Sequence, residues 1–217
     1  MATETNFIGA IECAIGWEVR DNHHVLDQYS VTREDVLQLC GGVPAREVLF
    51  VNVEITSSTA YTVTVNVQSN LYQVFRTINF DSKEIFNDKM RVFDKEQHLG
   101  TCLFLNQVAY ARQLGFIRLS TTALEWDGIE RWDGYYRWAR LGYQMTDRND
   151  LEDFNDLKRY FTPPVANLSE MVLRDDGYAF WIREGFTWVG EFLLADNSPS
   201  MEHLRRYLTM KKIDFTL

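Results

Sequence analysis

The sequence predicts an α+β fold, a mixed α/β arrangement in which helices flank a twisted, mainly antiparallel sheet and a helical extension follows at the C-terminal end. Two observations lead to this prediction. Between Glu47 and Val92 the chain is rich in β-branched and aromatic residues, many of which alternate with polar ones, as is typical of strands. Beyond Gln97 the apolar residues recur with the spacing of helices, so the period of the pattern changes there.

The composition is that of a folded protein with an acidic surface. The chain has 217 residues, of which 46% are hydrophobic, and this length is sufficient for one sizeable core. We expect a single domain, because no repeat or flexible linker divides the sequence. The formal net charge of −9 and the lack of a basic run argue against nucleic acid as a partner.

The cysteines and the apolar runs bear on the compartment. Cys13, Cys40 and Cys102 are odd in number and widely spaced, which favours neither a disulfide framework nor a zinc site, so no metal is expected. No apolar run reaches the roughly 20 residues of a membrane span, and no basic segment followed by an apolar one begins the chain. We therefore expect a cytoplasmic protein with no membrane partner.

The first part of the chain contains one clear helix signal. Residues 7–19 are compatible with a first strand or with an irregular entry. Thr32 followed by Asp35 predicts the start of a short helix, and Gly41 with Gly42 predicts its end. The next region holds four strand-like runs, for which we expect an antiparallel meander. These runs are residues 48–53, 61–67, 72–76 and 85–92.

The C-terminal third is expected to be mostly helical. Residues 116–122 predict a strand, and the aromatic-rich residues 123–133 fit either a core anchor or the lining of a cleft. Ser198 with Pro199 predicts the start of a last helix that ends near residue 210. The remaining expected elements are helices at residues 151–161 and 177–183, and a strand or aromatic connection at residues 186–194.

Residues 90–115 combine a strand end, a turn and a helix. The strand is expected to end near Val92, and the turn covers residues 97–102, where Gly100 would let the backbone come close to a ligand. The helix then runs to Gly115. Its free N–H groups and the positive end of its dipole would favour a phosphate at the turn. The helix carries an apolar stripe of Leu103, Phe104, Val108, Ala111 and Leu114.

At these residues the chain resembles the GNAT superfamily of acyl-CoA-dependent N-acetyltransferases, whose phosphate turn reads Gln/Arg-x-x-Gly-x-Gly/Ala. Gln97 and Gly100 match this motif, and the strand at residues 116–121 and the helix and exit at residues 135–143 follow in the family's order. The resemblance implies a GNAT-like domain over residues 1–217. Its acyl-CoA-binding core would cover about residues 46–146, and residues 147–217 would form a C-terminal extension.

The resemblance also implies acetyl-CoA as co-substrate and a set of residues that bind it. Backbone N–H groups at the end of the strand would hold the thioester carbonyl, and those of the turn would hold the diphosphate. The implied cofactor-binding residues are Met90, Arg91, Val92, Gln97, His98, Leu99, Gly100, Thr101 and Cys102.

The sequence offers several candidates for the two proton transfers of the reaction. Trp138 stands where many family members have a general-acid tyrosine, and Cys102 where they have Gly or Ala. Tyr135 is the first candidate for the acid because it lies one helical turn before Trp138, and Tyr136 is the second. For the amine proton, the sequence offers Glu47, Glu54 and Glu125 without ranking them.

Two functional hypotheses remain open at this point. The first is an N-acyltransferase that moves an acetyl group from acetyl-CoA to a small-molecule or peptidic amine, and it admits a homodimer. The alternative is a catalytically inactive GNAT-like binding or interaction module, which the two departures at Trp138 and Cys102 would suit.

Overall fold

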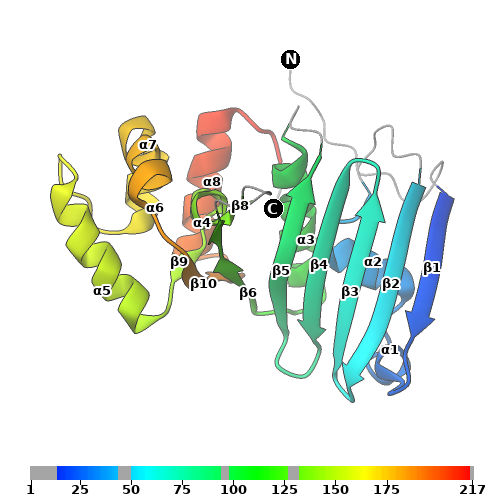
Figure 1. Ribbon diagram of the computed structural model, residues 1–217. Coiled ribbons are helices and arrows are strands. Elements are labelled where there is room, and N and C mark those ends of the chain that lie inside the picture. Colours follow the sequence, from blue (N-terminus) through cyan, green and yellow to red (C-terminus); the bar gives the residue numbers. More distant parts are fainter. Residues whose placement is uncertain (1–13, 44–49, 94–97, 127–131, 216–217) are drawn as a thin grey trace. The chain divides into compact units, whose positions relative to one another are not determined.

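The computed structural model describes residues 14–43, 50–93, 98–126 and 132–215 (Figure 1). The chain forms two compact units. The first unit consists of residues 1–117 and 214–217, and the second unit of residues 118–213. The boundary after Ile117 does not coincide with the limit at residue 146 that the sequence led us to expect.

A sheet of five neighbouring strands forms the first unit (Figure 1). Strand β1 pairs with β2 in parallel, and β2 to β5 form an antiparallel meander. The four-strand meander expected from the sequence is therefore confirmed, as is the mixed α+β class with a mostly antiparallel sheet. The strands are β1 (Ala14–Arg20), β2 (Phe50–Thr59), β3 (Thr62–Ser69), β4 (Tyr72–Asn79) and β5 (Glu84–Val92).

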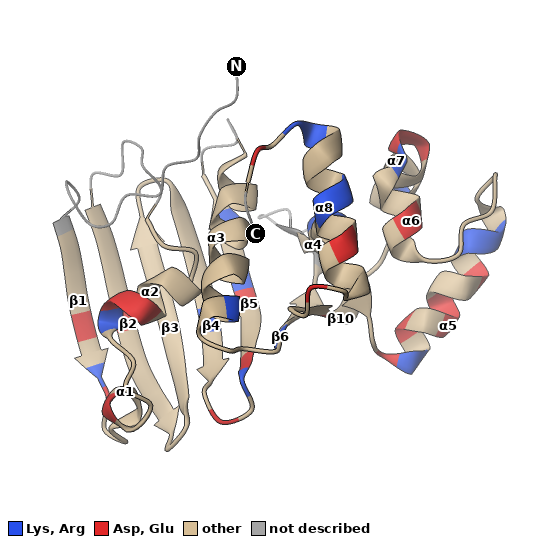
Figure 2. Ribbon diagram, turned by 180° about the vertical axis from the view of Figure 1, so that it is seen from behind, with Lys and Arg blue, Asp and Glu red and all other residues tan. Residues whose placement is uncertain are grey.

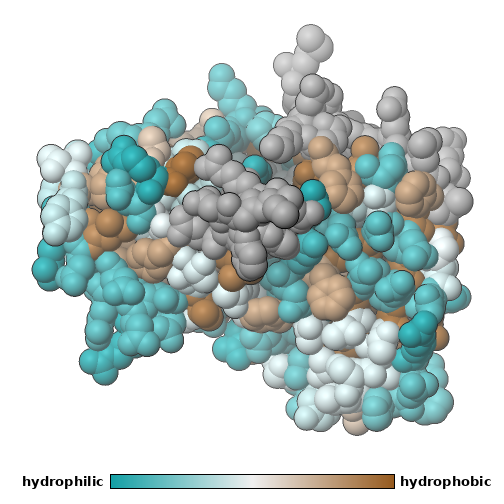
Figure 3. Space-filling model, in the orientation of Figure 1, coloured by the Kyte–Doolittle hydropathy of each residue, from teal (hydrophilic) through white to brown (hydrophobic). Residues whose placement is uncertain are grey.

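The alternation of residue types gives this sheet one apolar and one polar face. In β3, Val63, Val65 and Val67 are fully buried. Thr64 and Asn66, which lie between them, are half-buried. Helices α1 (Val25–Gln28), α2 (Arg33–Leu39) and α3 (Leu99–Gln113) lie on one face of the sheet, as both ribbon views show (Figures 1 and 2). In the space-filling view the opposite face carries many hydrophilic side chains (Figure 3).

Helices α2 and α3 are fixed to each other by local signals that the sequence contains. Thr32 and Asp35 form the expected capping box at the start of α2. Gly41 follows the helix with φ of 111°, and a Cβ there would lie 2.8 Å from the carbonyl oxygen of Leu103 in α3. The hydroxyl of Tyr110 in α3 donates a hydrogen bond to Asp35. The glycine therefore permits the close approach of α2 to α3.

Buried polar side chains lie between this sheet and its helices. Arg76 in β4 is 1% exposed, and its Nη1 donates to the carbonyl oxygens of Lys89 (2.6 Å) and Phe75 (2.9 Å). Asn87 in β5 and Gln107 in α3 exchange two hydrogen bonds of 3.1 and 2.9 Å. Because buried polar groups without partners are costly, these bonds fix how α3 packs on β5.

The second unit contains three further strands of the eight-stranded sheet, with helices around them. Strand β10 (Trp188–Leu193) pairs with β6 (Arg118–Ala123) on one side and with β9 (Gln144–Met145) on the other. The segment at residues 186–194 is thus a strand. Two further short strands, β7 (Glu125–Trp126) and β8 (Trp132–Asp133), form a separate antiparallel pair.

The helices of the second unit follow the apolar spacing of the sequence. The expected helix at residues 151–161 is α5 (Arg148–Leu157) followed by the 3-10 turn η1 (Lys158–Tyr160), and its acidic residues are visible in Figure 2. Residues 177–183 lie within α7 (Asp175–Glu184). The remaining helices are α4 (Gly134–Leu141), α6 (Leu168–Leu173) and α8 (Pro199–Lys211). Within the described ranges, no helix has the length and apolar character that a membrane span requires.

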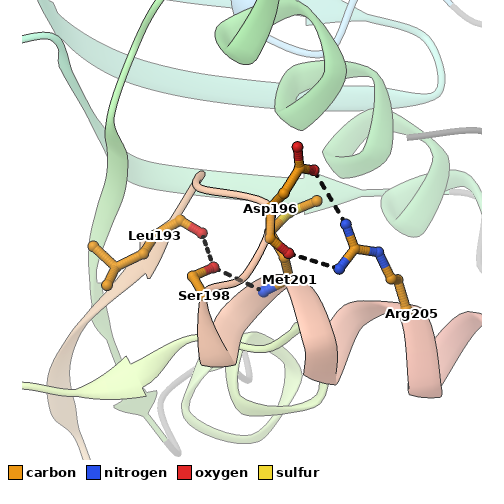
Figure 4. Close-up of polar contacts among 5 residues, drawn as sticks. All are labelled: Leu193, Asp196, Ser198, Met201 and Arg205. Atoms are coloured by element: carbon orange, nitrogen blue, oxygen red, sulfur yellow. Dashed lines mark hydrogen bonds and ion pairs between the residues drawn. The ribbon is translucent and has the colours of Figure 1, made fainter.

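The start of α8 is as the sequence predicted (Figure 4). Ser198 is the N-cap, and its Oγ accepts a 3.2 Å hydrogen bond from the N–H of Met201 and donates a 2.7 Å bond to the carbonyl oxygen of Leu193. Arg205, one turn further on, donates to the carbonyl oxygen and to Oδ1 of Asp196. These bonds attach the helix to the end of β10.

Candidate functional site

The end of β5 and the first turn of α3 lie against each other in the first unit. A Cβ added at Gly100 would lie 3.4 Å from Cγ2 of Val92 and 3.7 Å from Cε of Met90. The structure therefore brings together three of the residues that the sequence assigned to cofactor binding. Gln97 lies outside the described residues.

The first turn of α3 contains backbone donors for which the described part of the chain offers no acceptor. His98, the N-cap residue, has a left-handed backbone with φ of 62°, and its side chain makes no capping bond. The N–H of Cys102 donates to the carbonyl oxygen of His98 at 2.9 Å. Among the described residues, no acceptor binds the N–H groups of Leu99, Gly100 and Thr101. These three groups point out of the helix start together, where an anion could accept from them.

At the start of helix α1, by contrast, a side chain of the protein accepts hydrogen bonds from the free N–H groups. Its N-cap, His24, also has a left-handed backbone, but the carboxylate of Asp21 accepts bonds of 2.9 Å from the N–H groups of Val25 and Leu26. Burial acts to raise the pKa of Asp21, yet these amide bonds outweigh it, and the pKa lies below its usual value. The residue three before His98 is instead Lys95, which lies outside the described residues.

The charges near the start of α3 are mixed in the sequence, where Asp94 and Glu96 precede the helix, but the first turn itself favours an anion. The first turn of α3 contains no acidic residue, whereas those of α2, α5, α6, α7 and α8 each contain at least one. Arg91 is exposed at the end of β5, and its guanidinium lies 5.3 Å from the ring centroid of Phe93. A dipole end without a neighbouring carboxylate is more attractive to phosphate than one that has such a neighbour.

The side chains of the turn divide between the core and the surface. Leu99 and Cys102 are buried, with exposed fractions of 5% and 6%. Thr101 is half-buried and His98 is exposed. The Cys102 side chain, which is larger than the Gly or Ala of the family motif, is therefore directed into the core.

A carboxyl that the sequence did not single out, Asp88, lies in the middle of β5. Phe75 pairs with Lys89 and Arg76 with Asn87, so Asp88 is an extra residue, a β-bulge, in β5. Burial raises the pKa of Asp88, although the hydroxyl of Thr77 donates to it at 3.1 Å and Arg76 lies nearby. A bulge depends on the register of two strands, and no residue pattern within β5 predicts it. Sequence reasoning therefore had no signal for this position.

Tyr135 holds α4 to its neighbours in the second unit. It is 4% exposed, and its hydroxyl donates a hydrogen bond to the carbonyl oxygen of Ile182 in α7. Its own carbonyl oxygen accepts from the indole N–H groups of Trp181 (3.1 Å) and Trp188 (2.7 Å). The phenol of Tyr135 thus has a structural partner.

Tyr136 and Trp138 have different surroundings on the same helix. Tyr136 is half-buried, and its ring lies edge-on to those of Tyr135 (5.1 Å) and Tyr178 (5.6 Å). Trp138 is 6% exposed and packs edge-on against Tyr143 at 5.1 Å. These residues belong to the second unit, whereas β5 and α3 belong to the first.

The acidic residues that the sequence offered as bases are spread out. Glu54 in β2 accepts a 3.3 Å bond from Asn66 of β3, and Glu18, Arg20 and Thr56 line a shallow depression beside it. Glu47 and the side chain of Glu125 lie outside the described part. No group of three or more His, Cys, Asp or Glu residues in the described ranges could hold a metal ion.

Comparison of the chain with protein-family models, with curated proteins and with solved structures found no match.

Proposed function

We propose that this protein is an N-acyltransferase that moves an acetyl group from acetyl-CoA to a small-molecule or peptidic amine. The observation that carries the proposal is the start of α3. Three backbone N–H groups there have no acceptor among the described residues, no carboxylate lies in the first turn, and Gly100 packs on the end of β5. The diphosphate of CoA is the anion that such a turn would hold in this class of enzyme.

The end of β5 would orient the thioester. The N–H of Phe93 donates to the carbonyl oxygen of Leu71 at 2.8 Å, toward the β4 side of the strand. Because N–H groups alternate in direction along a strand, those of Val92 and Met90 face the opposite edge. We assign these two amides to the thioester carbonyl, whose oxygen becomes negative as the amine attacks.

The reaction requires two proton transfers. The amine nitrogen forms a bond to the acyl carbon and loses a proton to a base, and the carbon–sulfur bond breaks to leave a thiolate that takes up a proton. Asp88 is our candidate for the base because it lies at the bulge two residues before Met90 and its pKa is raised by burial. Tyr136 is our first candidate for the acid, and Tyr135 the second, since the Tyr135 hydroxyl is bonded to Ile182.

The hydrogen bond from the Tyr135 hydroxyl to the carbonyl oxygen of Ile182 favours the alternative, a binding module without catalysis. If the phenol of Tyr135 serves only to hold α7, and Trp138 occupies the place of the usual acid, the protein would bind a CoA-like ligand and release nothing. A thiol-release assay separates the two functions. The protein is incubated with acetyl-CoA and a panel of primary amines, and free CoA thiol is measured over time.

Amine-dependent thiol release above the rate without protein is the expected result. Saturable acetyl-CoA binding with no release on any amine would support the binding module. Neither binding nor release would contradict both functions.

A further inference from the structure

The guanidinium of Arg140 lies between tyrosine rings from two other helices of the second unit. Arg140 is in α4, and its Cζ lies 3.9 Å from the ring centroid of Tyr178 in α7 and 5.5 Å from that of Tyr207 in α8. Stacking on aromatic faces stabilises a cation and holds the planar guanidinium in one orientation. Three helices therefore cooperate to position this one charged group.

No protein group in the described part of the chain accepts a hydrogen bond from this guanidinium. Its Nε is buried without a partner, and no acidic side chain forms an ion pair with it. A guanidinium has five N–H donors and no acceptor, so its remaining donors are on the terminal Nη atoms. Other arginines of this acidic chain do pair with carboxylates, namely Arg20, Arg118, Arg148, Arg159, Arg174, Arg183 and Arg205.

The hydroxyls of Tyr178 and Tyr207, like the guanidinium of Arg140, form no hydrogen bond with another described residue. Tyr207 is only 7% exposed, yet its hydroxyl has no hydrogen-bond partner among the described residues, and the same holds for Tyr178. Neither hydroxyl oxygen is among the buried atoms without a partner, so both reach solvent and are open to a ligand. The cluster of Arg140, Tyr178 and Tyr207, which we call the Arg140 cluster, therefore contains a fixed cation and two free hydroxyls.

The surrounding charges suit an anionic guest. Arg137 is exposed one turn before Arg140, and Arg206 adjoins Tyr207. His203 adds no charge at neutral pH, because burial lowers its pKa to about 4. The 3.0 Å hydrogen bond between its Nε2 and the carbonyl oxygen of Arg140 acts to raise the pKa but is outweighed by burial. The charge that the cluster itself offers to a ligand is thus that of Arg140.

We propose that the Arg140 cluster is a binding site for an oxyanion, either a carboxylate or a phosphate group. The two Nη atoms would donate to two oxygens of the anion in a bidentate pair, the geometry in which arginine binds both groups. The phenol hydroxyls would supply further donors. This site does not depend on the acyl-transfer proposal, because all its residues lie in the second unit and none of them belongs to the proposed acetyl-CoA site.

Calorimetric titration of the full chain with sodium phosphate and, separately, with sodium acetate tests the site, each against sodium chloride at equal ionic strength. We expect saturable binding of at least one of the two ions. Because the start of α3 is also expected to hold a phosphate, binding counts for this site only where Arg140→Lys weakens it. Such binding of phosphate alone would assign a phosphate group, and of acetate alone a carboxylate. No saturable binding of either would overturn the proposal.

The variants Arg140→Lys and Arg137→Lys form a matched pair on α4. Arg140→Lys keeps the charge but removes the planar fork, so it should weaken binding about tenfold or more, while Arg137→Lys should leave it unchanged. Equal losses in both would mean diffuse attraction to a basic surface and would contradict the site. If Arg140→Lys fails to fold, Tyr207→Phe, which removes only a hydroxyl, should still weaken binding severalfold, and unchanged binding in it would overturn the site as proposed.

Discussion

At the scale of single residues, Asp88 has a charge that the fold does not favour. Its pKa is raised by burial above the ordinary value of 3.8, so its ionised form lowers the stability of the folded state as the pH rises through the folded pKa. Asp88→Asn removes this charge and keeps an acceptor for Thr77. We expect urea midpoints equal to or above those of the unmodified protein at pH 7, with the difference vanishing near pH 3.

The same variant tests the proposed base. If Asp88 accepts the amine proton, Asp88→Asn should lower turnover by about 10²-fold or more while acetyl-CoA still binds. Asp81→Asn, in the exposed turn between β4 and β5, is the control for a lost surface charge. Loss of stability at pH 7 in Asp88→Asn, with turnover unchanged, would show that Asp88 is a structural carboxylate.

The hydroxyls of Tyr135 and Tyr136 should have different roles, the first in stability and the second in turnover. Tyr135→Phe leaves the carbonyl oxygen of Ile182 without its donor, so it should lower the free energy of unfolding by about 1–3 kcal/mol. Tyr136→Phe should lower turnover by about 10²-fold. Urea unfolding and the thiol-release assay measure both quantities for each variant. A fall in turnover for Tyr135→Phe alone would reverse the assignment.

Gly100 shows how far a motif determines a site. Its spacing from Gln97 predicted a turn that a ligand could approach, and α3 does begin at the expected place. The missing Cβ, however, faces Val92 and Met90 in β5 at ordinary contact distances. That direction depends on how the helix packs on the strand, which the sequence pattern does not specify.

Because a Cβ at Gly100 would point toward β5, substitutions there should act on stability. Gly100→Ala should fit against β5 and raise the free energy of unfolding by up to about 1 kcal/mol, because alanine favours a helix over glycine. Acetyl-CoA affinity should not change. Gly100→Val should instead lose stability, since its added methyl groups would meet Val92 and Met90. Lost acetyl-CoA affinity in a fully stable Gly100→Ala would mean that the glycine faces the ligand.

At the scale of elements, α8 depends on one side chain at its start. Ser198 is 5% exposed and links the N–H of Met201 to the carbonyl oxygen of Leu193. Ser198→Ala removes both bonds and should cost about 1–2 kcal/mol of unfolding free energy, the upper range for an N-cap. Asn197→Ala, at the exposed neighbouring position, should cost much less. Equal urea midpoints for the two variants would contradict the role of the cap.

The elements that the sequence predicted well are those with local signals. β2 to β5 alternate apolar and polar residues, and α2 and α8 begin at capping residues. Helix α6, with only 6 residues, is too short to show a helical period, and it was missed. The parallel pairing of β1 with β2 joins residues that are distant in the sequence, so no local pattern could reveal it.

At the scale of the whole molecule, the division into two units could not be read from the sequence. Ile117 and Arg118, which border the two units, lie in a segment with strand character on either side and without a linker composition. The boundary follows from which elements contact one another in space. Composition changes at linkers, and there is none here.

Acid should destabilise the protein through His203. Burial lowers the pKa of this histidine from 6.5 to about 4, so below pH 6.5 the unfolded chain takes up a proton that the folded chain does not. The contribution of His203 to stability should therefore fall by roughly 2 kcal/mol between pH 7 and pH 5, while protonation of Asp88, whose pKa is raised, acts in the opposite direction. The lowered pKa of Asp21 acts only below 3.8 and leaves this window unaffected. His203→Gln should flatten the dependence, and an unchanged slope would assign it to other groups.

The start of α3 is the central feature of the proposed acyltransferase, and the titration of acetyl-CoA into three proteins tests it most directly. Thr101→Glu places a carboxylate in the first turn, where it suits the helix dipole but repels a phosphate, and Thr101→Gln is its uncharged control. We predict that the unmodified protein and Thr101→Gln bind acetyl-CoA alike and that Thr101→Glu binds at least about tenfold more weakly, a difference of about 1.4 kcal/mol, at unchanged stability. Equal binding by all three, or by none, would contradict the proposal.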